Sequence, residues 1–180
     1  METLRLGFSP CPNDTFIFHA MLHGQLDTNG LRFEVHMEDV EALNGMVAAQ
    51  SLDVAKLSYH AYLHQLEHWQ MLPSGSALGF GVGPLLIAKQ PLDLQDMADK
   101  TIAIPGANTT AHFLLKVCLG EGLKTKEILF SDIEAAVLNG EVDAGVIIHE
   151  NRFTYADKGL HLVQDLGAFW ENKTGQAIPL

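Results

Sequence analysis

One pattern of residues occurs twice in the chain and constrains its fold more than any other feature. Residues 51–59 and 141–149 each follow a helical segment, place an aspartate just before a strand of small residues, and end in a polar residue. Such a duplication predicts two similar α/β lobes, each built as strand–turn–helix and then helix–strand. The alternative is chance similarity, because helix–loop–strand passages of this kind are common in α/β proteins.

Hydrophobic periodicity along the chain predicts the elements of these lobes. Apolar residues that alternate or run together predict strands at 4–8, 31–37, 53–57, 100–104 and 143–148. Apolar residues at helical spacing predict helices at 15–22, 40–50, 59–69, 109–119 and 131–139. The last of these helices opens with a capping-box pattern from Ser131 to Glu134. The predicted fold class is therefore α/β, with mixed sheets flanked by helices.

In a two-lobed α/β protein the lobes close around a ligand, and the site lies at the carboxyl ends of the strands. Residues that follow predicted strands are therefore the candidates for the site. They are the residues at 9–15, 58–59, 74–76 and 106–110, together with His149.

Charge and composition exclude some classes of partner. The chain has 180 residues, of which 47% are hydrophobic, with 11 basic residues against 22 acidic ones and a net charge of −11. This charge disfavours nucleic acids and anionic membranes, whereas helix N-termini still allow a small anionic substrate. The N-terminal residues lack a signal-peptide pattern, no apolar run is long enough to span a membrane, and the two cysteines match no metal or redox spacing. We expect a soluble, cytoplasmic protein with reduced thiols.

Two candidate sites follow strands in the second half of the chain. The segment 106–111 ends in hydroxyl residues at a predicted helix start, a pattern typical of a carboxylate or phosphate cradle and also of an ordinary helix cap formed by Asn108 or Thr109. It lacks the Gly-Lys-Ser/Thr ending of a nucleotide-binding loop. His149 follows an apolar strand, where we expect it to be partly desolvated and suited to general base chemistry. Its alternative is a structural role at the end of the strand.

Two further patterns have ordinary explanations. His60, His64 and His68 share one face of a predicted helix, as do His19 and His23, so two imidazoles could meet one metal ion. A solvated helix face is the default, because a fuller ligand set is absent. The glycines at 75, 79, 81 and 83 precede a strand and not a helix, so they suit a hinge better than a dinucleotide loop.

The segment 9–16 (Ser-Pro-Cys-Pro-Asn-Asp-Thr-Phe) resembles the N-terminal signature of the 1,4-dihydroxy-6-naphthoate synthase family, which acts in the futalosine route to menaquinone. Segments similar to that family follow in the same order at 56–59, 81–85, 105–111 and 143–150. The resemblance covers essentially the whole chain, and its first and last motifs are specific.

The resemblance implies a fold like that of the type II periplasmic binding proteins. The first lobe would span 1–86, the second 87–174, and 175–180 would begin a return to the first lobe. It implies a lyase that converts cyclic dehypoxanthinyl futalosine, a carboxylate-bearing substrate, into 1,4-dihydroxy-6-naphthoate and a sugar-derived fragment, without a metal or organic cofactor. A sister enzyme, chorismate dehydratase, and a solute-binding protein without chemistry are the alternatives.

The same resemblance implies roles for particular residues. His149 would be the base, and its neutral imidazole would remove a proton from a sugar hydroxyl to start fragmentation. The substrate carboxylate would be held by Thr109 and Thr110, and the first-lobe wall would be lined by Asn13, Asp14 and Ser58.

Members of that family usually continue for roughly half as much again, returning to the first lobe, whereas domain sizes alone permit either length. This sequence stops where the return would begin. We therefore expect an incomplete first lobe that exposes apolar surface or pairs with a second copy as a homodimer.

Overall fold

The structure, a computed structural model, describes residues 2–179 and divides into two compact units, Met1–Gly75 (unit 1) and Ser76–Leu180 (unit 2). The expected lobe boundary after residue 86 falls inside strand β5 (Leu85–Ala88). Residue 1 of the expected first lobe and residue 180 of the expected return segment lie outside the described residues.

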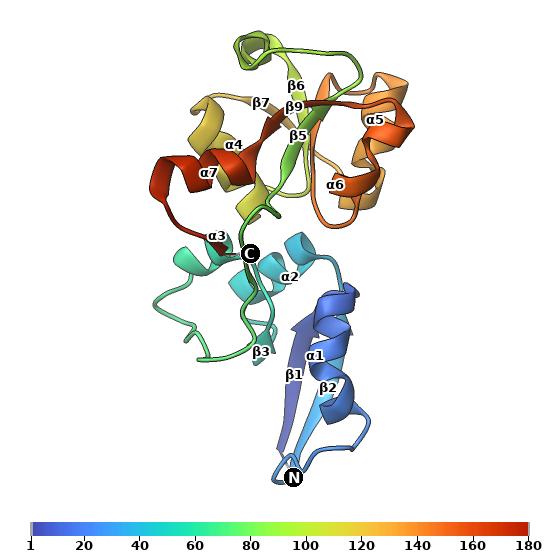
Figure 1. Cartoon of the computed structure of the whole chain (residues 1–180). Coiled ribbons are helices and arrows are strands. Elements are labelled where there is room, and N and C mark those ends of the chain that lie inside the picture. Colours follow the sequence, from blue (N-terminus) through green and yellow to red (C-terminus); the bar gives the residue numbers. More distant parts are fainter. Residues whose placement is uncertain (1, 180) are drawn as a thin grey trace. The chain divides into compact units, whose positions relative to one another are not determined.

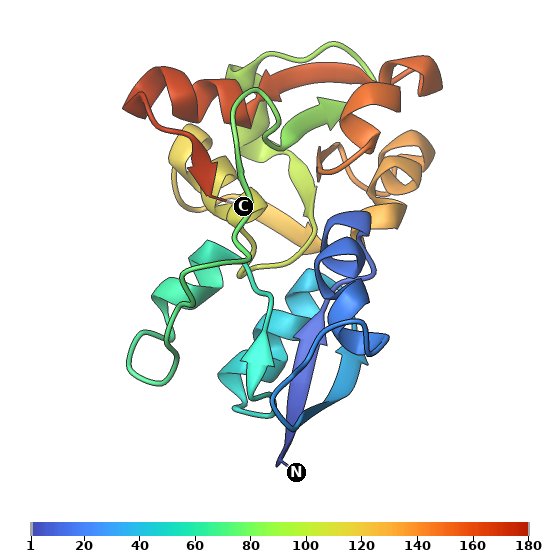
Figure 2. The same ribbon diagram turned by 60° about the horizontal axis from the view of Figure 1, so that its bottom comes forward.

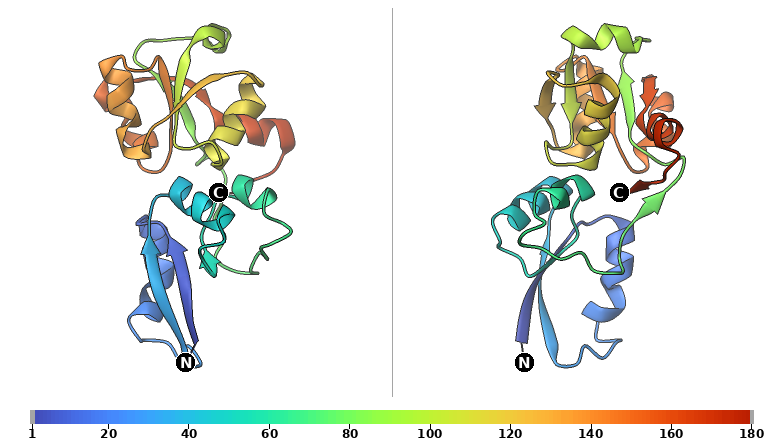
Figure 3. Two further views of the ribbon diagram at one scale, coloured as in Figure 1. Left: turned by 180° about the vertical axis from the view of Figure 1, so that it is seen from behind. Right: turned by 90° about the vertical axis from the view of Figure 1, so that its left-hand side faces the viewer.

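Unit 1 is built on a sheet of three parallel strands in the order β2–β1–β3 (Figure 1). Its elements are β1 (Glu2–Phe8), α1 (Pro12–Leu22), β2 (Leu31–Met37), α2 (Val40–Ala48), β3 (Val54–Ala55) and α3 (Tyr59–Leu63). The strands run in the same direction (Figure 2), and β1 pairs with β2 over its whole length. Helices α1 and α2 lie on opposite faces of this sheet (Figure 3, right).

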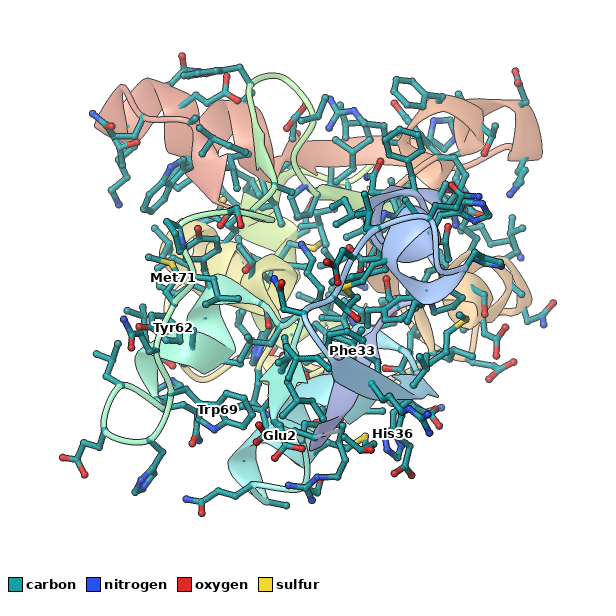
Figure 4. The ribbon with its side chains drawn as sticks, turned by 90° about the horizontal axis from the view of Figure 1, so that it is seen from below. Glu2, Phe33, His36, Tyr62, Trp69 and Met71 are labelled. Atoms are coloured by element: carbon teal, nitrogen blue, oxygen red, sulfur yellow. The ribbon has the colours of Figure 1, made fainter. Side chains whose placement is uncertain are left out.

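The two faces of β1 pack against different helices because successive strand residues point to opposite sides. The Phe8 ring lies 4.8 Å from the ring of Phe18 in α1. Gly7, on the other face, lies against Leu43 of α2 and Leu52. Trp69 (Figure 4) packs against this second cluster, and its indole N–H donates to the Val47 carbonyl at 3.2 Å.

Unit 2 holds a five-stranded mixed sheet in the order β7–β6–β8–β5–β9. Its strands are β4 (Leu78–Gly79), β5 (Leu85–Ala88), β6 (Thr101–Ile104), β7 (Lys124–Glu127), β8 (Ala144–Ile147), β9 (His161–Asp165) and β10 (Ile178–Pro179). Its helices are α4 (Thr110–Leu119), α5 (Ile133–Asn139), α6 (Asn151–Thr154) and α7 (Leu166–Thr174), with 3-10 helices η1 (Leu94–Asp99), η2 (Phe130–Asp132) and η3 (Ala156–Lys158). Strands β6, β7 and β8 are parallel, β5 is antiparallel to β8 and β9, and β4 pairs separately with β10.

The sheet of unit 2 is buried on both faces. Leu86 of β5 and Val146 of β8 belong to the core that includes Leu114 of α4 and Leu166 of α7. Alternate residues of the same strands pack into a second core with α5. Helices α4 and α7 therefore cover one face and α5 the other, as Figure 1 shows. This confirms the predicted class of mixed sheets flanked by helices.

Several predicted boundaries were wrong, each for a local reason. Helix α1 begins at Pro12 and not at residue 15, because proline suits the first turn of a helix. Helix α3 ends at Leu63, so the helix predicted at 59–69 is shorter in the structure and spans five residues. The capping box predicted at 131–134 does not form. The Ser131 hydroxyl donates a hydrogen bond to the Asp132 carboxylate inside η2, and α5 begins at Ile133. Strand β7 was missed because it is an exposed edge strand of polar residues.

The duplicated aspartate has a structural explanation in both units. The Asp53 carboxylate accepts the Arg5 backbone N–H at 2.8 Å, and the Asp53 N–H donates to the Arg5 carbonyl at 2.9 Å. The Asp143 carboxylate accepts the Thr101 N–H at 2.8 Å, and the Asp143 N–H donates to the Thr101 carbonyl at 3.0 Å. Each aspartate therefore makes two hydrogen bonds to one residue of the neighbouring strand, just before the first paired residues of the two parallel strands. We call this pair of hydrogen bonds the aspartate clamp.

Large apolar side chains are exposed in the last part of unit 1. Leu63, Leu66, Met71 and Leu72 each have more than half of their surface exposed. Unit 2 also exposes large apolar side chains, among them Phe80 and Phe153, so the incomplete first lobe stays a prediction. Among residues 2–179, no helix is long and apolar enough to cross a membrane.

Gly83 lets two backbone segments of unit 2 pack closely against each other. A Cβ at Gly83 would lie 2.4 Å from the Gly167 Cα, so the two backbones approach too closely for any side chain. Among the other glycines predicted to form a hinge, Gly75 and Gly81 have positive φ angles of 87° and 65°. Gly83 is thus explained by packing within unit 2.

Replacing Gly83 should therefore destabilise unit 2. We expect Gly83→Ala to lower the free energy of unfolding by about 1–3 kcal/mol through overpacking. Gly45→Ala, in the exposed middle of α2 with no atom within 4 Å of the new Cβ, should raise it by about 0.5–1 kcal/mol. Urea unfolding of the two variants measures both effects, and equal stability of Gly83→Ala and wild type would contradict the packing argument.

The Asp53 clamp should make unit 1 sensitive to acid. The side-chain hydrogen bond from Arg5 is the main cause that lowers the pKa of Asp53 from 3.8 to about 2. Because the folded-state pKa is depressed, the stabilisation is present above about pH 4 and is lost as the pH falls towards 2. Asp53→Asn should therefore be less stable than wild type at pH 7, and thermal unfolding should show the difference shrinking between pH 4 and pH 2. Asp99→Asn, at a side chain 98% exposed, should behave like wild type throughout.

Candidate active site

The predicted residues of unit 1 lie at the edge where its parallel strands end. β1 leads into the turn at 9–11 and then α1, while the neighbouring β3 leads into Lys56 and Ser58. Because parallel strands share a carboxyl edge, the fold brings Asp14 and Ser58 to the same edge of this sheet.

Asp14 is buried and organises the signature turn. It lies in the first turn of α1, where the helix N-terminus favours a carboxylate. One carboxylate oxygen accepts the Ser9 N–H at 3.1 Å and the Ser9 hydroxyl at 2.8 Å, and the other lies 3.5 Å from the Lys56 ammonium. These contacts join the segments that follow β1 and β3. The neighbouring Asn13 is exposed.

Ser58 is held by an asparagine that the sequence analysis did not single out. Asn44 donates its amide to the Ser58 hydroxyl at 2.8 Å and accepts the Ser58 N–H at 3.1 Å. Both residues are buried, so their polar groups need partners of this kind. The sequence signal that could have indicated a buried Asn44 is its position beside Leu43 and Val47, which are buried on the same helix α2.

Lys56 was also missed as a site residue, because a single basic residue in the sequence gives no local signal of what it contacts. Besides its ion pair with Asp14, its ammonium donates to the Gly75 carbonyl at 2.5 Å. Only a fifth of its side chain is exposed. Lys56 is therefore a cation fixed at the carboxyl edge of the unit 1 sheet.

The predicted residues of unit 2 also share a carboxyl edge. In its sheet, β6 lies between the parallel strands β7 and β8. β6 leads into the turn before Thr109, β7 leads towards Phe130, and β8 leads to His149. The fold therefore places Thr109, Thr110 and His149 along one edge.

The two threonines differ in what their hydroxyls do. Thr109 caps α4: its hydroxyl donates to the Gly106 carbonyl at 2.8 Å and accepts the His112 N–H at 3.2 Å. Thr110 begins the helix, and its buried hydroxyl oxygen has no hydrogen-bond partner among the described residues. A buried hydroxyl in this state costs free energy that a ligand oxygen would recover. The start of α4 thus combines an ordinary cap with a hydroxyl suited to an anion.

His149 lies in a turn with unusual backbone geometry. Its φ angle is 57°, a left-handed conformation that is uncommon for a residue with a side chain. Its ring meets the ring of Phe130 at a centroid distance of 5.6 Å, edge to face. His149 is an exposed residue whose ring also contacts Phe130, so its partial desolvation stays a prediction. The exposed imidazole is accessible to a ligand at this edge.

The predicted rows of histidines do not form metal sites. The turn α3 ends before His64, so His60, His64 and His68 do not share a continuous helix face. His60 and His64 meet edge to face at 5.2 Å, and His19 and His23 stack at 4.1 Å. Within residues 2–179, no three His, Cys, Asp or Glu side chains are grouped to hold a metal ion.

A surface hollow of about 590 Å³ lies elsewhere in unit 1, along the exposed side of α1. It is lined by Pro12, Thr15, Phe16, His19, Ala20 and Gln25. Pro12 and Thr15 belong to the candidate segment 9–15, but Asn13, Asp14 and Ser58 do not line the hollow, and no Lys or Arg side chain lines it to orient an anion. The convergence of polar groups at the strand edges is therefore the better guide to the site.

Comparison with known proteins identifies the family. A family model described as menaquinone biosynthesis matches residues 4–180. The chain belongs to this family. The match spans both strand edges described above, including the segments that carry Asp14, Thr110 and His149.

Two curated relatives of the chain are named 1,4-dihydroxy-6-naphtoate synthase. The protein from Thermus thermophilus is 49% identical over 100% of this chain and 65% of its own length. The protein from Streptomyces coelicolor is 40% identical over 99% of this chain and 64% of its own length. The chain therefore spans a little under two thirds of the length of these relatives.

Solved structures share the fold. A crystal structure of a protein from Archaeoglobus fulgidus, 39% identical, superposes with a TM-score of 0.91 over 99% of this chain and 66% of that one. The alkanesulfonate-binding protein from Xanthomonas axonopodis pv. citri, 18% identical, superposes with a TM-score of 0.66 over 91% of this chain and 61% of that one. The fold of the chain is thus like that of the periplasmic binding proteins, as predicted.

The cap of α4 can be tested by substitution. Thr109→Val removes both hydroxyl hydrogen bonds, and we expect it to lower the free energy of unfolding by about 1–2 kcal/mol. Thr109→Ser keeps the hydroxyl and should stay close to wild type. Urea unfolding measures the difference, and a loss in Thr109→Val no larger than the loss in Thr109→Ser would contradict the contribution of the cap.

Proposed function

We propose that this chain acts in menaquinone biosynthesis as a lyase of the futalosine pathway, converting cyclic dehypoxanthinyl futalosine into 1,4-dihydroxy-6-naphthoate. The observation that carries the proposal is the pairing, on one sheet edge of unit 2, of an accessible histidine with a buried, unpartnered hydroxyl at a helix start. A base and an anion cradle are the two functions that fragmentation of a carboxylate-bearing substrate needs.

In this proposal the start of α4 binds the substrate carboxylate. The Thr109 hydroxyl holds the turn through its hydrogen bonds to the Gly106 carbonyl and the His112 N–H. Thr110 supplies the buried hydroxyl that lacks a partner among the described residues. Free N–H groups and the positive end of the helix dipole favour an anion here without a formal charge. A carboxylate held at this point would orient the rest of the substrate along the edge.

His149 is the proposed base. Its neutral imidazole takes the proton from a sugar hydroxyl, and the electron pair of the broken O–H bond forms a carbonyl as the neighbouring carbon–carbon bond breaks. The electrons of that bond pass to the ring fragment, which becomes aromatic, and the imidazolium returns its proton to the products. The step is redox-neutral as written, so we propose that it needs no metal or organic cofactor.

The unit 1 residues have proposed roles that follow from their contacts. Ser58 offers a hydroxyl oriented by Asn44, and Asn13 offers an exposed amide. Asp14 is occupied by Ser9 and Lys56, so we propose that it shapes the substrate-binding wall from behind.

We place this reaction in the cytoplasm. Cys11 and Cys118 are not joined by a disulfide in the part of the chain that the structure describes, as is usual in a reducing compartment. The net charge of −11 supports small molecules, and not nucleic acids or anionic membranes, as partners.

The experiment is to incubate the 180-residue chain with cyclic dehypoxanthinyl futalosine and to measure 1,4-dihydroxy-6-naphthoate. We expect turnover by wild type and a loss of roughly 100-fold or more in kcat for His149→Ala, since general base catalysis contributes about 10²–10⁴-fold. His161→Ala, at an exposed histidine of β9, is the matched control and should keep the wild-type rate.

The outcomes separate the competing functions. Undiminished activity in His149→Ala would remove the proposed base. Binding of the substrate by wild type without turnover would favour a solute-binding protein, and absence of binding would contradict the substrate assignment.

A further inference from the structure

The turn that carries His149 has little apolar support of its own. It joins β8 to α6, a helix of four residues, none of which is buried. The left-handed backbone at His149 costs free energy and persists only where surrounding contacts hold it. Besides the Phe130 ring that meets the His149 imidazole, polar contacts hold this turn.

Arg152 supplies these contacts. Its backbone N–H donates to the His149 carbonyl at 3.3 Å, which closes the turn. Its guanidinium donates to the Gly83 carbonyl and to the Asp165 carboxylate, the latter at 2.9 Å. Only 14% of the arginine side chain and 22% of the aspartate side chain are exposed, so this pair is more than a surface contact.

Both partners of Arg152 are themselves fixed. Asp165 ends β9, lies opposite Leu85 of β5, and caps α7 by accepting the Ala168 N–H at 2.9 Å. Gly83 packs backbone to backbone against Gly167 at the start of α7. The Leu166 N–H donates to the Pro84 carbonyl at 3.0 Å and ties the same two segments together. Arg152 thus connects a weakly supported turn to a rigid corner of the sheet.

We infer that Arg152, with Asp165, is a positioning residue that holds His149 in place for the proposed reaction. A planar guanidinium with two fixed acceptors restricts the turn more than a lysine ammonium would. The residue does not need to touch the substrate, because its effect passes through the backbone it shares with His149. This inference rests on the proposed function for its kinetic consequence, and on the structure alone for its effect on His149.

The first test reads the position of His149 without any substrate. Because the Phe130 ring lies edge to face with the His149 ring at 5.6 Å, we expect it to shift the imidazole proton resonances of His149, which a His149→Ala spectrum assigns. We expect Arg152→Met to move these resonances towards the values of a freely exposed histidine, whereas those of His112 and His161 stay unchanged. An unchanged His149 resonance in folded Arg152→Met would overturn the inference.

A general loss of stability must be separated from this effect. Val137→Ala, at a buried position in α5, lowers the stability of unit 2 without removing a polar contact of the turn. It should leave the His149 resonances in place. If Val137→Ala moved them as far as Arg152→Met does, the role of Arg152 would be merely structural.

Two gentler variants cover the case in which Arg152→Met does not fold. Asp165→Asn keeps an oxygen to cap α7 but removes the charge that Arg152 meets, and should move the His149 resonances in the same direction by a smaller amount. Arg152→Lys keeps the charge and should retain part of the wild-type shift. Wild-type resonances in Asp165→Asn would contradict the inference.

The kinetic test uses the substrate of the proposed function. Arg152→Met should lower kcat by roughly 10- to 100-fold, since small displacements of a catalytic group cost factors of this size, with KM changed by less than about threefold. In a His149→Ala background the same substitution should have no further effect on the residual rate. Additive losses would overturn the inference. If wild type has no activity at all, the proposed function fails, while the resonance of His149 still decides whether Arg152 positions it.

Discussion

The pairing of parallel strands by an aspartate is the interaction on which both units depend. In each unit a carboxylate accepts the backbone N–H of a residue on the neighbouring strand, and the aspartate donates its own N–H to the carbonyl of that same residue. The reciprocal contact sets the register just ahead of the first paired residues, Leu6 with Val54 and Ile102 with Ala144. Once the register is set, the strands end together, and whatever follows them meets at one edge.

The two strand edges use their polar groups differently. In unit 1 the buried groups are engaged with one another: Asp14 with Ser9 and Lys56, and Asn44 with Ser58. Such a network rigidifies the edge because each member would be costly to leave unpaired. In unit 2 the edge retains a buried hydroxyl without a partner at Thr110 and an exposed imidazole at His149. The contacts in unit 1 fix the shape of its strand edge, whereas Thr110 and His149 at the edge of unit 2 are the groups that the proposed reaction uses.

The fold alone says little about chemistry. A protein that binds alkanesulfonates shares it at 18% identity, whereas relatives named as synthases are 49% and 40% identical. Side chains grafted on a fold, and not the fold itself, carry chemistry. His149 illustrates this, because it occupies a short, left-handed turn with no buried residue in the following helix, and its place depends on a polar contact from Arg152 to a distant corner of the same unit.

The sequence by itself determined the elements whose signal is local. The strand at 31–37 was predicted with its observed bounds, because alternating apolar residues report directly on a half-buried strand. The strands around 101–104 and 144–147 were found from their apolar runs, and Thr109 was one of two residues predicted to cap the following helix. The aspartate of the duplicated pattern was visible too, although its partners were not. Only the tertiary structure decided which residues meet: Asn44 with Ser58, Lys56 with Asp14, and Arg152 with Asp165. It also made β7 a strand despite its polar sequence, because its backbone groups find partners on β6. Contacts between segments far apart in the chain depend on register and packing, which no local pattern of residues encodes.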